Sequence, residues 1–504
     1  MKFIKILNIS KLLFLNYYLN YLVMEMDDNL IEKKEPNKRF ILRKTIRALA
    51  LILLHSTILV QSMVTTTFNT ANSNIRASLR ITEKTHSIFT FIYHLGQFIS
   101  AICVILIMRR PERKGTVLYS VFTTFAAVIF FQFTDNQMII MPIYFFTGFC
   151  VMVMNVYISM WIDQLSLFAF KTIFLSITNL CRAIGVTCSL LLNYYLGPDN
   201  FKKSFLVEGI LLGCIGTAIT FIHEVYFMSD LLLYKGKFGE QKFKWKAKTQ
   251  KDNEPDSESI ENAESIYRYR HSGISTKDNY IIVILYGYTK NKRYMCGLFS
   301  NLILASATAG FSNYSLGFIN SYFSEPKSDA YRILKNRIMF TLTGPFCAVI
   351  NISILSFFVG NYYSKTTPVI MFSFYLLTSI IGNIIPYLSS YGNLTFASLL
   401  YTIFSSSMGP YLQGCNLSAG TPSKKPFGIT ISNICGILLG TVPAPYIYAT
   451  LLKSFAKEEV LAIFMRFLLV GTIFNFLMMV FRCKEYPKKE EEKQEKPAIE
   501  LSDK

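Results

Sequence analysis

The chain has 504 residues, of which 52% are hydrophobic and 16% are charged, and its mean hydropathy is +0.35. A soluble protein carries about 25% charged residues, so this composition cannot cover the two or three soluble domains that such a length would form. The net charge of +19 is large, but the basic residues lie in loops and at segment ends and form no basic helix. The composition therefore argues against a soluble protein and against nucleic-acid binding, and it predicts an integral membrane protein.

About a dozen apolar segments, each as long as a membrane helix, run through the chain. Roughly 20 apolar residues cross the hydrocarbon core as a helix, because lipid offers no partner for unpaired backbone groups. We expect spans at 48–70, 86–108, 115–134, 138–162, 171–196, 205–228, 294–322, 338–361, 367–388, 393–417, 427–452 and 460–482. Six spans precede and six follow a charged middle segment, which is the layout of a duplicated carrier. The sequence thus predicts an all-α polytopic membrane protein with 12 transmembrane helices in two six-helix halves.

Polar stretches divide the chain further. The expected parts are a cytoplasmic amino-terminal segment 1–47, a first half 48–230, a cytoplasmic linker with an interfacial helix 231–292, a second half 293–482 and a disordered cytoplasmic tail 483–504. Residues 235–278 are dense in Lys, Glu, Asp and Ser, a composition typical of disorder. Residues 1–26 fit an upstream extension or a surface helix better than a cleaved signal, because no small-residue cleavage site follows them.

The charge of the loops predicts the orientation. Basic turns at 109–114 and 424–425 fall on the same side as both termini in a twelve-span topology, and Lys and Arg are in excess on the cytoplasmic side of membrane proteins. Arg332, Lys335 and Arg337 fall on the opposite side in this topology and count against it. The balance favours cytoplasmic termini and a cytoplasmic linker.

The sequence contains no motif of an enzyme or a metal centre. It has no GxSxG, HExxH or P-loop pattern, no CxxC and only five histidines. Its ten cysteines are scattered, mostly within apolar segments, where they behave as small buried hydrophobic residues. We expect no catalysis, no cofactor and no metal, and any driving force has to come from solute or ion gradients.

The eleventh expected span carries the most specific motif. Residues 421–428 read Thr-Pro-Ser-Lys-Lys-Pro-Phe-Gly, and residues 431–447 read Ile-Ser-Asn-Ile-Cys-Gly-Ile-Leu-Leu-Gly-Thr-Val-Pro-Ala-Pro-Tyr-Ile. This resembles the Spinster-like branch of the major facilitator superfamily, in which a Pro and two basic residues precede a helix with a Leu-Gly-Asp-x-x-Ser-Pro motif. The organic-anion carrier branch has a related Leu-Gly-x-x-Pro-x-Pro segment. Gly440 lets a neighbouring helix approach, while Pro443 and Pro445 remove backbone donors and bend the helix.

Other motifs of the superfamily are present in altered form. The residues at these motif positions are Arg109, Arg110, Arg113, Lys114, Asp163, Lys171 and Asn361. Arg109 and Asn361 stand where the superfamily places an acid. Neutral residues near Val64 and Cys150 align with the acidic and basic positions of Spinster-like carriers, so the resemblance does not imply proton coupling through those groups.

Polar side chains inside the spans are the candidate substrate-binding residues, because such groups are costly in lipid unless they face a cavity or a partner. Arg182 lies about eleven residues into the fifth span, roughly 16 Å deep, near the midplane. His94 and Gln97 share one helical face, and His94 titrates near neutral pH. Glu208, which begins the sixth span, fits a structural or rim role better. The candidate set is Arg182, His94, Gln97, Asn155, Asn313, Asn351 and Gln413.

The resemblance implies a secondary transporter that moves a small organic solute, lipid-like or anionic, by alternating access. The guanidinium of Arg182 would suit an anionic head group. The alternative, motivated by Arg109 and Asn361, is a facilitator-fold receptor or scaffold that does not transport. The expected partners are a small-molecule substrate and the bilayer of the plasma or endolysosomal membrane. We expect facilitated movement down a gradient, with at most a modest pH dependence due to His94.

Overall fold

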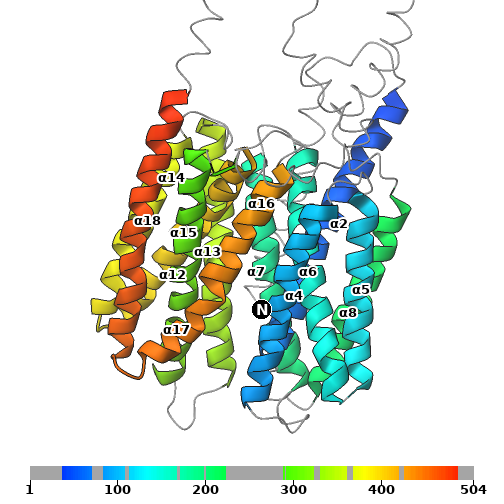
Figure 1. The fold of residues 1–504 in the computed structure, drawn as a ribbon, viewed down its shortest axis with the longest axis horizontal. Helices are drawn as coiled ribbons and strands as arrows, with labels where there is room; N and C mark the ends of the chain where they lie inside the picture. Colours follow the sequence, from blue (N-terminus) through cyan, green and yellow to red (C-terminus); the bar gives the residue numbers. More distant parts are fainter. Residues whose placement is uncertain are drawn as a thin grey trace, which may run out of the picture.

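The computed structural model describes residues 37–70, 83–107, 113–134, 136–166, 171–197, 200–222, 288–289, 291–322, 330–359, 367–418 and 425–485. Every regular element in these ranges is helical. Figure 1 shows two helix bundles standing side by side. The predicted linker 235–278, the amino-terminal segment as far as residue 36 and the tail beyond residue 485 lie outside the described residues.

The first bundle contains six long helices. These are α2 (Asn37–Thr70), α4 (Glu83–Ile107), α5 (Arg113–Phe133), α6 (Gln137–Leu165), α7 (Lys171–Leu196) and α8 (Phe201–Phe221). The second bundle contains α12 (Lys292–Tyr322), α13 (Ala330–Val359), α14 (Thr367–Ile384) with the 3₁₀ turn η4 (Ile385–Tyr387), α15 (Tyr391–Ser418), α16 (Lys425–Ile434), the π-helical η5 (Cys435–Thr441), α17 (Pro443–Leu451) and α18 (Lys457–Glu485). Because α16, η5 and α17 follow one another as a single span, each half has six spans.

The predicted fold class is confirmed. Ten helices are long and apolar enough to cross a membrane, and α4 adds a shorter apolar stretch, Ile88–Val104. The chain is therefore an integral multi-pass membrane protein. The fifth span matches its predicted bounds, whereas α13 begins at Ala330 instead of 338 and α8 ends at Phe221 instead of 228.

Helix ends define two sides of the molecule. The first residue of α2, the last of α8, the first of α12 and the last of α18 lie at one end of the bundles, which we call the linker end (Figure 1). The other end is the far end. Lys114, from the predicted basic turn, acts at the linker end as a helix cap: its Nζ donates to the carbonyl oxygens of Thr220, at 2.9 Å, and of Ile222. The last carbonyls of α8 have no partner within their own helix, so this cation stabilises the end of α8.

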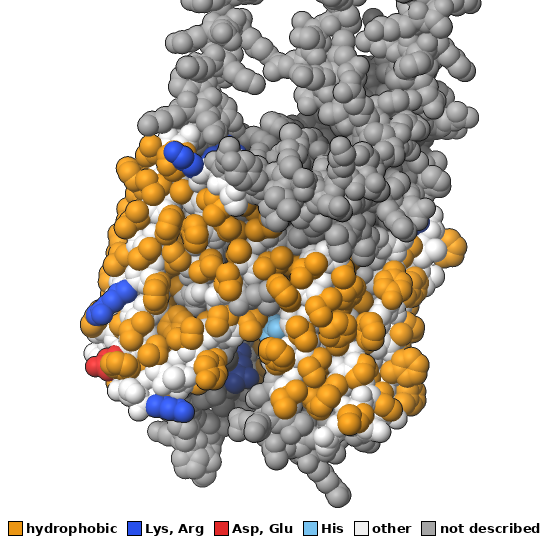
Figure 2. Space-filling view, viewed as in Figure 1, with side chains coloured by type: hydrophobic (Ala, Val, Ile, Leu, Met, Phe, Trp, Pro, Cys, Tyr) orange, Lys and Arg blue, Asp and Glu red, His pale blue; other side chains and the backbone are white. Residues whose placement is uncertain are grey.

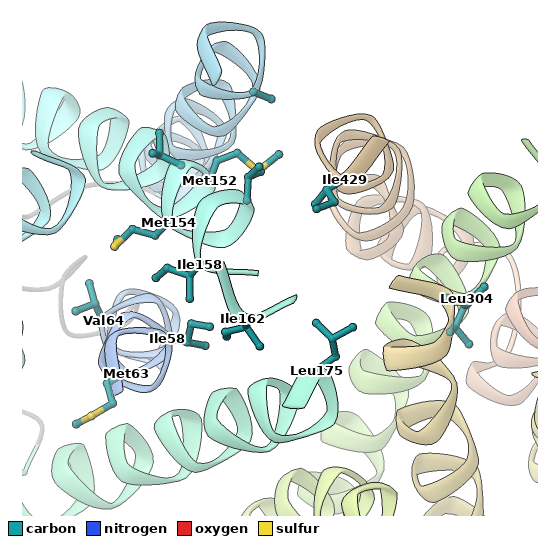
Figure 3. Close-up of a cluster of buried hydrophobic side chains, with 14 of the residues drawn as sticks. Ile58, Met63, Val64, Met152, Met154, Ile158, Ile162, Leu175, Leu304 and Ile429 are labelled. Carbon is teal, nitrogen blue, oxygen red and sulfur yellow. The ribbon is translucent and has the colours of Figure 1, made fainter. Parts of the chain in front are cut away.

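Small residues set the closest helix crossings within the first half. A Cβ atom on Gly148 would lie 2.0 Å from the carbonyl oxygen of Tyr93, so α6 and α4 touch through their backbones. A Cβ atom on Gly185 would lie 2.2 Å from the carbonyl oxygen of Leu59, which brings α7 equally close to α2. Apolar side chains fill the remaining space: Figure 3 shows Ile58 of α2 near Ile158 and Ile162 of α6.

The two halves meet mainly through four helix pairs, in which α7 packs on α13 and α15 while α16 packs on α4 and α6. Because α16 is the linker-end part of its span, the eleventh span closes on the first half at that end. Its far-end part, α17, lies away from α4 (Figure 1). Figure 2 shows a hollow between the halves toward the far end, with Lys or Arg side chains inside it. Among the described residues, the eleventh span thus contacts the first half at the linker end, and the hollow lies toward the far end.

Candidate functional site

The centre of the candidate site is Arg182 on α7, a helix that contacts both halves. One turn earlier on the same helix, Asn179 lies against α15: its Nδ2 is 3.3 Å from the position a Cβ of Gly409 would occupy. Arg182 follows Asn179 by three residues and precedes Gly185, which packs on Leu59 of α2, by three residues, so it lies on the side of α7 between α15 and α2. Its side chain is half-buried.

Arg182 makes one hydrogen bond within the described part of the chain, from Nη2 to Oδ1 of Asn155 on α6, at 3.2 Å. A guanidinium has five N–H donors and is always charged, so most of its donors have no partner among the described residues. The Asn155 amide is neutral and does not compensate the charge. A half-buried cation without an anionic partner is partly desolvated, and a bound anion would offset that cost.

Gln61 on α2 completes what we call the arginine cluster, which consists of Gln61, Asn155 and Arg182. Its Nε2 donates to the carbonyl oxygen of Val151, at 3.1 Å, and to Oδ1 of Asn155, at 3.5 Å. Its Oε1 is buried and has no hydrogen-bond partner in the described structure. The cluster thus offers spare donors on Arg182 and a spare acceptor on Gln61. Sequence reasoning missed Gln61, although an amide in the middle of the first span was an available signal.

His94 and Gln97 form a separate pair on α4. Nδ1 of His94 is 3.1 Å from Oε1 of Gln97, and the His94 ring packs edge-on against Tyr93, with 5.2 Å between centroids. No hydrogen bond joins this pair to the arginine cluster in the described structure. The structure therefore places His94 and Gln97 together, as their spacing predicted, but apart from Arg182.

The second half contributes neutral polar groups to the candidate set. Nδ2 of Asn351 on α13 is 3.5 Å from Oγ of Ser407 on α15, a weak contact between two neighbouring helices. Gln413 lies half-buried on α15. Asn301, which the sequence analysis did not select, donates from Nδ2 to Oγ of Ser432 at 3.1 Å and so joins α12 to α16. Asn313 lies in α12, but its side chain is outside the described atoms.

Arg337 is a second basic residue within the helices. It was expected on the side opposite the termini, one residue before the span at 338–361, whereas α13 begins at Ala330 and includes it near the far end. Arg337 shares a stripe of α13 with Gly344 and Asn351, at seven-residue spacing, and a Cβ on Gly344 would lie 2.7 Å from the carbonyl oxygen of Thr402 on α15. The stripe therefore faces α15. The Nε of Arg337 is buried without a hydrogen-bond partner in the described structure.

The eleventh span is divided at the predicted motif. A Cβ on Gly440 would lie 3.0 Å from both Cβ of Ala305 and the carbonyl oxygen of Leu302, so η5 packs closely on α12. The backbone N–H of Val442 donates to the carbonyl of Ile437 at 2.8 Å, which is a π-type bond. Pro443 then begins α17. Pi-helical segments and prolines are common causes of bends in helices.

The remaining motif positions are only partly described. Lys171 opens α7, and Pro445 lies in the first turn of α17. Asp163 belongs to the last turn of α6 and Arg113 begins α5, but the side chains of Asp163, Arg113 and Pro445 are outside the described atoms. Arg109, Arg110 and Asn361 lie outside the described residues altogether.

Comparison with known proteins identifies solved structures that have a similar fold. No family profile and no curated protein sequence matches the chain. Among solved structures, it is similar to a variant of the E. coli fucose:proton symporter FucP, with 11% identity and a TM-score of 0.61 over 86% of this chain and 99% of that one. FucP in an outward conformation, a major facilitator superfamily transporter, matches with 12% identity and a TM-score of 0.58 over 86% of this chain and 99% of that one.

A third similar structure is the proton:xylose symporter XylE, also of the major facilitator superfamily, bound to 6-bromo-6-deoxy-D-glucose. It matches with 14% identity and a TM-score of 0.62 over 88% of this chain and 97% of that one. These likenesses cover almost the whole of each solved chain, so the complete twelve-span architecture is shared. The fold is that of the major facilitator superfamily.

Proposed function

We propose that the chain is a secondary transporter that moves a small organic anion by alternating access, and that Arg182 binds the anionic group. The main support for this proposal is the set of hydrogen-bond partners of the Arg182 guanidinium. The guanidinium has one neutral partner, Asn155 on α6, and no acidic partner among the described residues. An anion with two acceptor oxygens would engage the planar guanidinium at two points and neutralise it.

The arrangement of the halves supports alternating access. The linker end is closed by α16 against α4 and α6, while the far end has the hollow in Figure 2. Arg182 lies near the middle of α7, a helix that contacts both halves, on the side between α15 and α2. A solute bound there would lie where rocking of one half against the other exchanges the open side.

Arg337 supports an anionic solute independently. It lies about seven residues from the far end of α13, so it is roughly 10 Å inside that end. In the antiparallel α7, Arg182 lies fourteen residues from the far end, or roughly 21 Å. An anion that enters from the far end therefore passes the level of Arg337 before it reaches Arg182. Two basic side chains at successive depths raise the local concentration of anions.

We further propose an amphipathic, lipid-like solute such as a lysophospholipid or a sphingoid phosphate. The motif of Gly440 and Pro443 resembles the Spinster-like branch, with the organic-anion carrier branch second. Most of the described residues of α6 next to Asn155 are apolar, including Met152, Met154 and Ile158, although these three side chains are packed in the core. The proposal of a lipid-like solute therefore rests on the motif resemblance.

We propose that the linker end faces the cytoplasm, since Lys114 lies there and α5 and α16 begin there at Arg113 and Lys425. Tags placed after residue 485 and within 235–278 should both be protected from membrane-impermeant reagents in sealed cells. Opposite accessibility of the two tags would contradict the twelve-span topology.

The direct test is uptake into proteoliposomes of two solutes with the same chain and different head groups, sphingosine 1-phosphate and sphingosine. We expect uptake of the phosphate ester, its loss in Arg182→Ala and partial recovery in Arg182→Lys, because an ammonium cannot make the planar two-point contact.

Arg466→Ala is the matched control, because Arg466 is exposed on α18 and its only hydrogen bond in the described structure is a contact of 3.5 Å with the Tyr387 hydroxyl. Equal uptake by Arg182→Ala and the wild-type protein would overturn the proposal. Binding without any flux would support a receptor instead.

A further inference from the structure

Glu208, on the second turn of α8, is a carboxyl group enclosed in the first half. Its side chain is 0% exposed. Oε1 accepts a hydrogen bond of 2.6 Å from the Thr67 hydroxyl on α2, and Oε2 is buried without a hydrogen-bond partner in the described structure. This environment corrects the reading of Glu208 as a rim residue, since the group is sealed between helices.

The surroundings of Glu208 are hydroxyls, one amide and aromatic rings. Thr67 also lies 2.8 Å from the Ser189 hydroxyl and 3.3 Å from Nδ2 of Asn193, both on α7. Ser204 on α8 donates to Oδ1 of Asn193 at 2.7 Å. We call Thr67, Ser189, Asn193, Ser204 and Glu208 the carboxyl network. It ties α2, α7 and α8 together near the far end.

Aromatic rings close the space beside the network. The ring of Phe205, on the turn before Glu208, packs against Phe68 of α2, with 4.6 Å between centroids, and against Phe131 of α5, with 4.9 Å. Among the members of the network, Asn193 alone is half-buried, and it lies one turn before the far end of α7. The network is therefore nearest to solvent on the far side.

Within the described structure, no charged group on the helices packed against α8 bonds or ion-pairs with Glu208. His55 on α2 instead lies 2.7 Å from the Leu51 carbonyl oxygen, inside the contact between α2 and α7. The titratable side chains described on α2, α5, α7 and α8 besides Glu208 are Arg47, His55, Lys114, Tyr119, Lys171, Cys181, Arg182, Cys188, Tyr194, Tyr195, Lys202, Lys203 and Cys214. A carboxylate enclosed without a cation is strongly unfavourable, whereas a neutral carboxylic acid can remain with one hydrogen bond.

We propose that Glu208 is a proton-binding site. Its carboxylate takes a proton from a hydronium ion at the far side, through the hydroxyls of Thr67 and Ser189, and becomes a neutral carboxylic acid while one water is released. The reverse step returns the proton to water. No other reactant takes part.

The position of Glu208 links proton binding to the arginine cluster. Thr67 lies six residues after Gln61 on α2, and Ser189 lies seven residues after Arg182 on α7, so each pair is separated by about 10 Å along its helix. The same two helices therefore carry both sites. Losing the proton places a charge between α2, α7 and α8 and weakens their packing, and this shifts the two helices that hold the solute. This coupling step rests on the proposed transport function, whereas the proton site does not.

The proton site is tested by infrared difference spectroscopy of the full chain in lipid, titrated between about pH 5 and about pH 9, in H₂O and in D₂O. We expect a carboxylic-acid C=O band that disappears as pH rises, that shifts in D₂O and that is absent in Glu208→Gln. Glu458→Gln, which removes an exposed carboxylate at the start of α18, is the matched control and should keep the band. Thr67→Val should shift the band frequency, because the carboxyl loses its hydrogen-bond donor. The same titrating band in the wild-type protein and in Glu208→Gln would overturn the proposal.

The coupling step is tested by uptake of sphingosine 1-phosphate with and without an imposed pH gradient. We expect a gradient to change wild-type uptake at least threefold and to leave the uptake by Glu208→Gln unchanged. An equal response in both proteins would overturn the coupling. If no protein takes up the solute under any gradient, the proposed function fails, and the infrared titration still decides whether Glu208 binds a proton.

Discussion

The arginine cluster and the carboxyl network share two helices, α2 and α7, and yet they are built in opposite ways. Arg182 is half-buried on a helix that contacts both halves, and most of its donors have no partner among the described residues. Glu208 is fully buried inside one half and is closed off by Phe205 and its aromatic neighbours. A half-buried guanidinium with unpaired donors, such as that of Arg182, can bind a solute. A fully buried carboxyl group, such as that of Glu208, can exchange only a proton.

The largest effect is expected at Arg182. Arg182→Ala removes the charge that receives the anion, so uptake of sphingosine 1-phosphate should fall by about two orders of magnitude, equivalent to about 3 kcal/mol. Detergent-extracted protein should keep the wild-type elution profile and melting temperature, because Arg182 has one weak protein partner. Loss of folded protein in this variant would instead assign Arg182 a structural role.

Gln61→Ala is expected to have the next largest effect. It removes the spare acceptor and the amide that holds Asn155, which should lower the affinity for solute about tenfold, or about 1.4 kcal/mol. Gln61→Glu sharpens the comparison, because a carboxylate there would pair with Arg182 and compete with the solute. Uptake by Gln61→Glu that equals the wild-type rate would show that Arg182 does not receive the anion.

Arg337→Ala should have a smaller effect, limited to solute capture. We expect KM to rise about threefold with the maximal rate unchanged, since this side chain lies nearer the far end than the arginine cluster. High salt should reduce the difference between Arg337→Ala and wild type, because ions screen an attraction at long range. A change in maximal rate with KM unchanged would contradict a role in capture.

His94→Gln should have the smallest effect. His94 contacts Gln97 and Tyr93 on its own helix and has no hydrogen bond to either cluster in the described structure. We expect uptake within about twofold of wild type and an unchanged response to a pH gradient. A pH response that is lost in His94→Gln and kept in Glu208→Gln would reverse the roles assigned to these two residues.

The sequence predicts the architecture well because lipid imposes a simple rule on it. Each span must be a helix of sufficient apolar length, and this rule placed α7 correctly and most other helices within a few residues. It began α13 at 338 instead of Ala330, because Arg332, Lys335 and Arg337 interrupt the apolar run there. It also treated the eleventh span as one bent helix. In the structure, the hydrogen bonds between Cys435 and Thr441 are of the π type. We attribute this local change to packing against α12, which the sequence pattern does not reveal.

The candidate site was predictable only in part. Arg182 and Asn155 stood out as polar residues in apolar segments, and the structure joins them by a hydrogen bond. Gln61 and the network around Glu208 depend on which residues of separate helices meet, and one sequence does not specify those pairs. The hydroxyl of Thr67 is ordinary in a helix until the structure places it 2.6 Å from a buried carboxyl.

The central claim, that Arg182 receives the anionic group of the solute, is tested most directly by equilibrium binding to the purified full chain. Radiolabelled sphingosine 1-phosphate should bind the wild-type protein and Arg466→Ala equally, and it should be displaced by other phosphate monoesters of long-chain alcohols but not by sphingosine. Arg182→Ala should show no saturable binding over the same range. Saturable binding of equal affinity in Arg182→Ala, or displacement by sphingosine as effective as that by the phosphate esters, would contradict the claim.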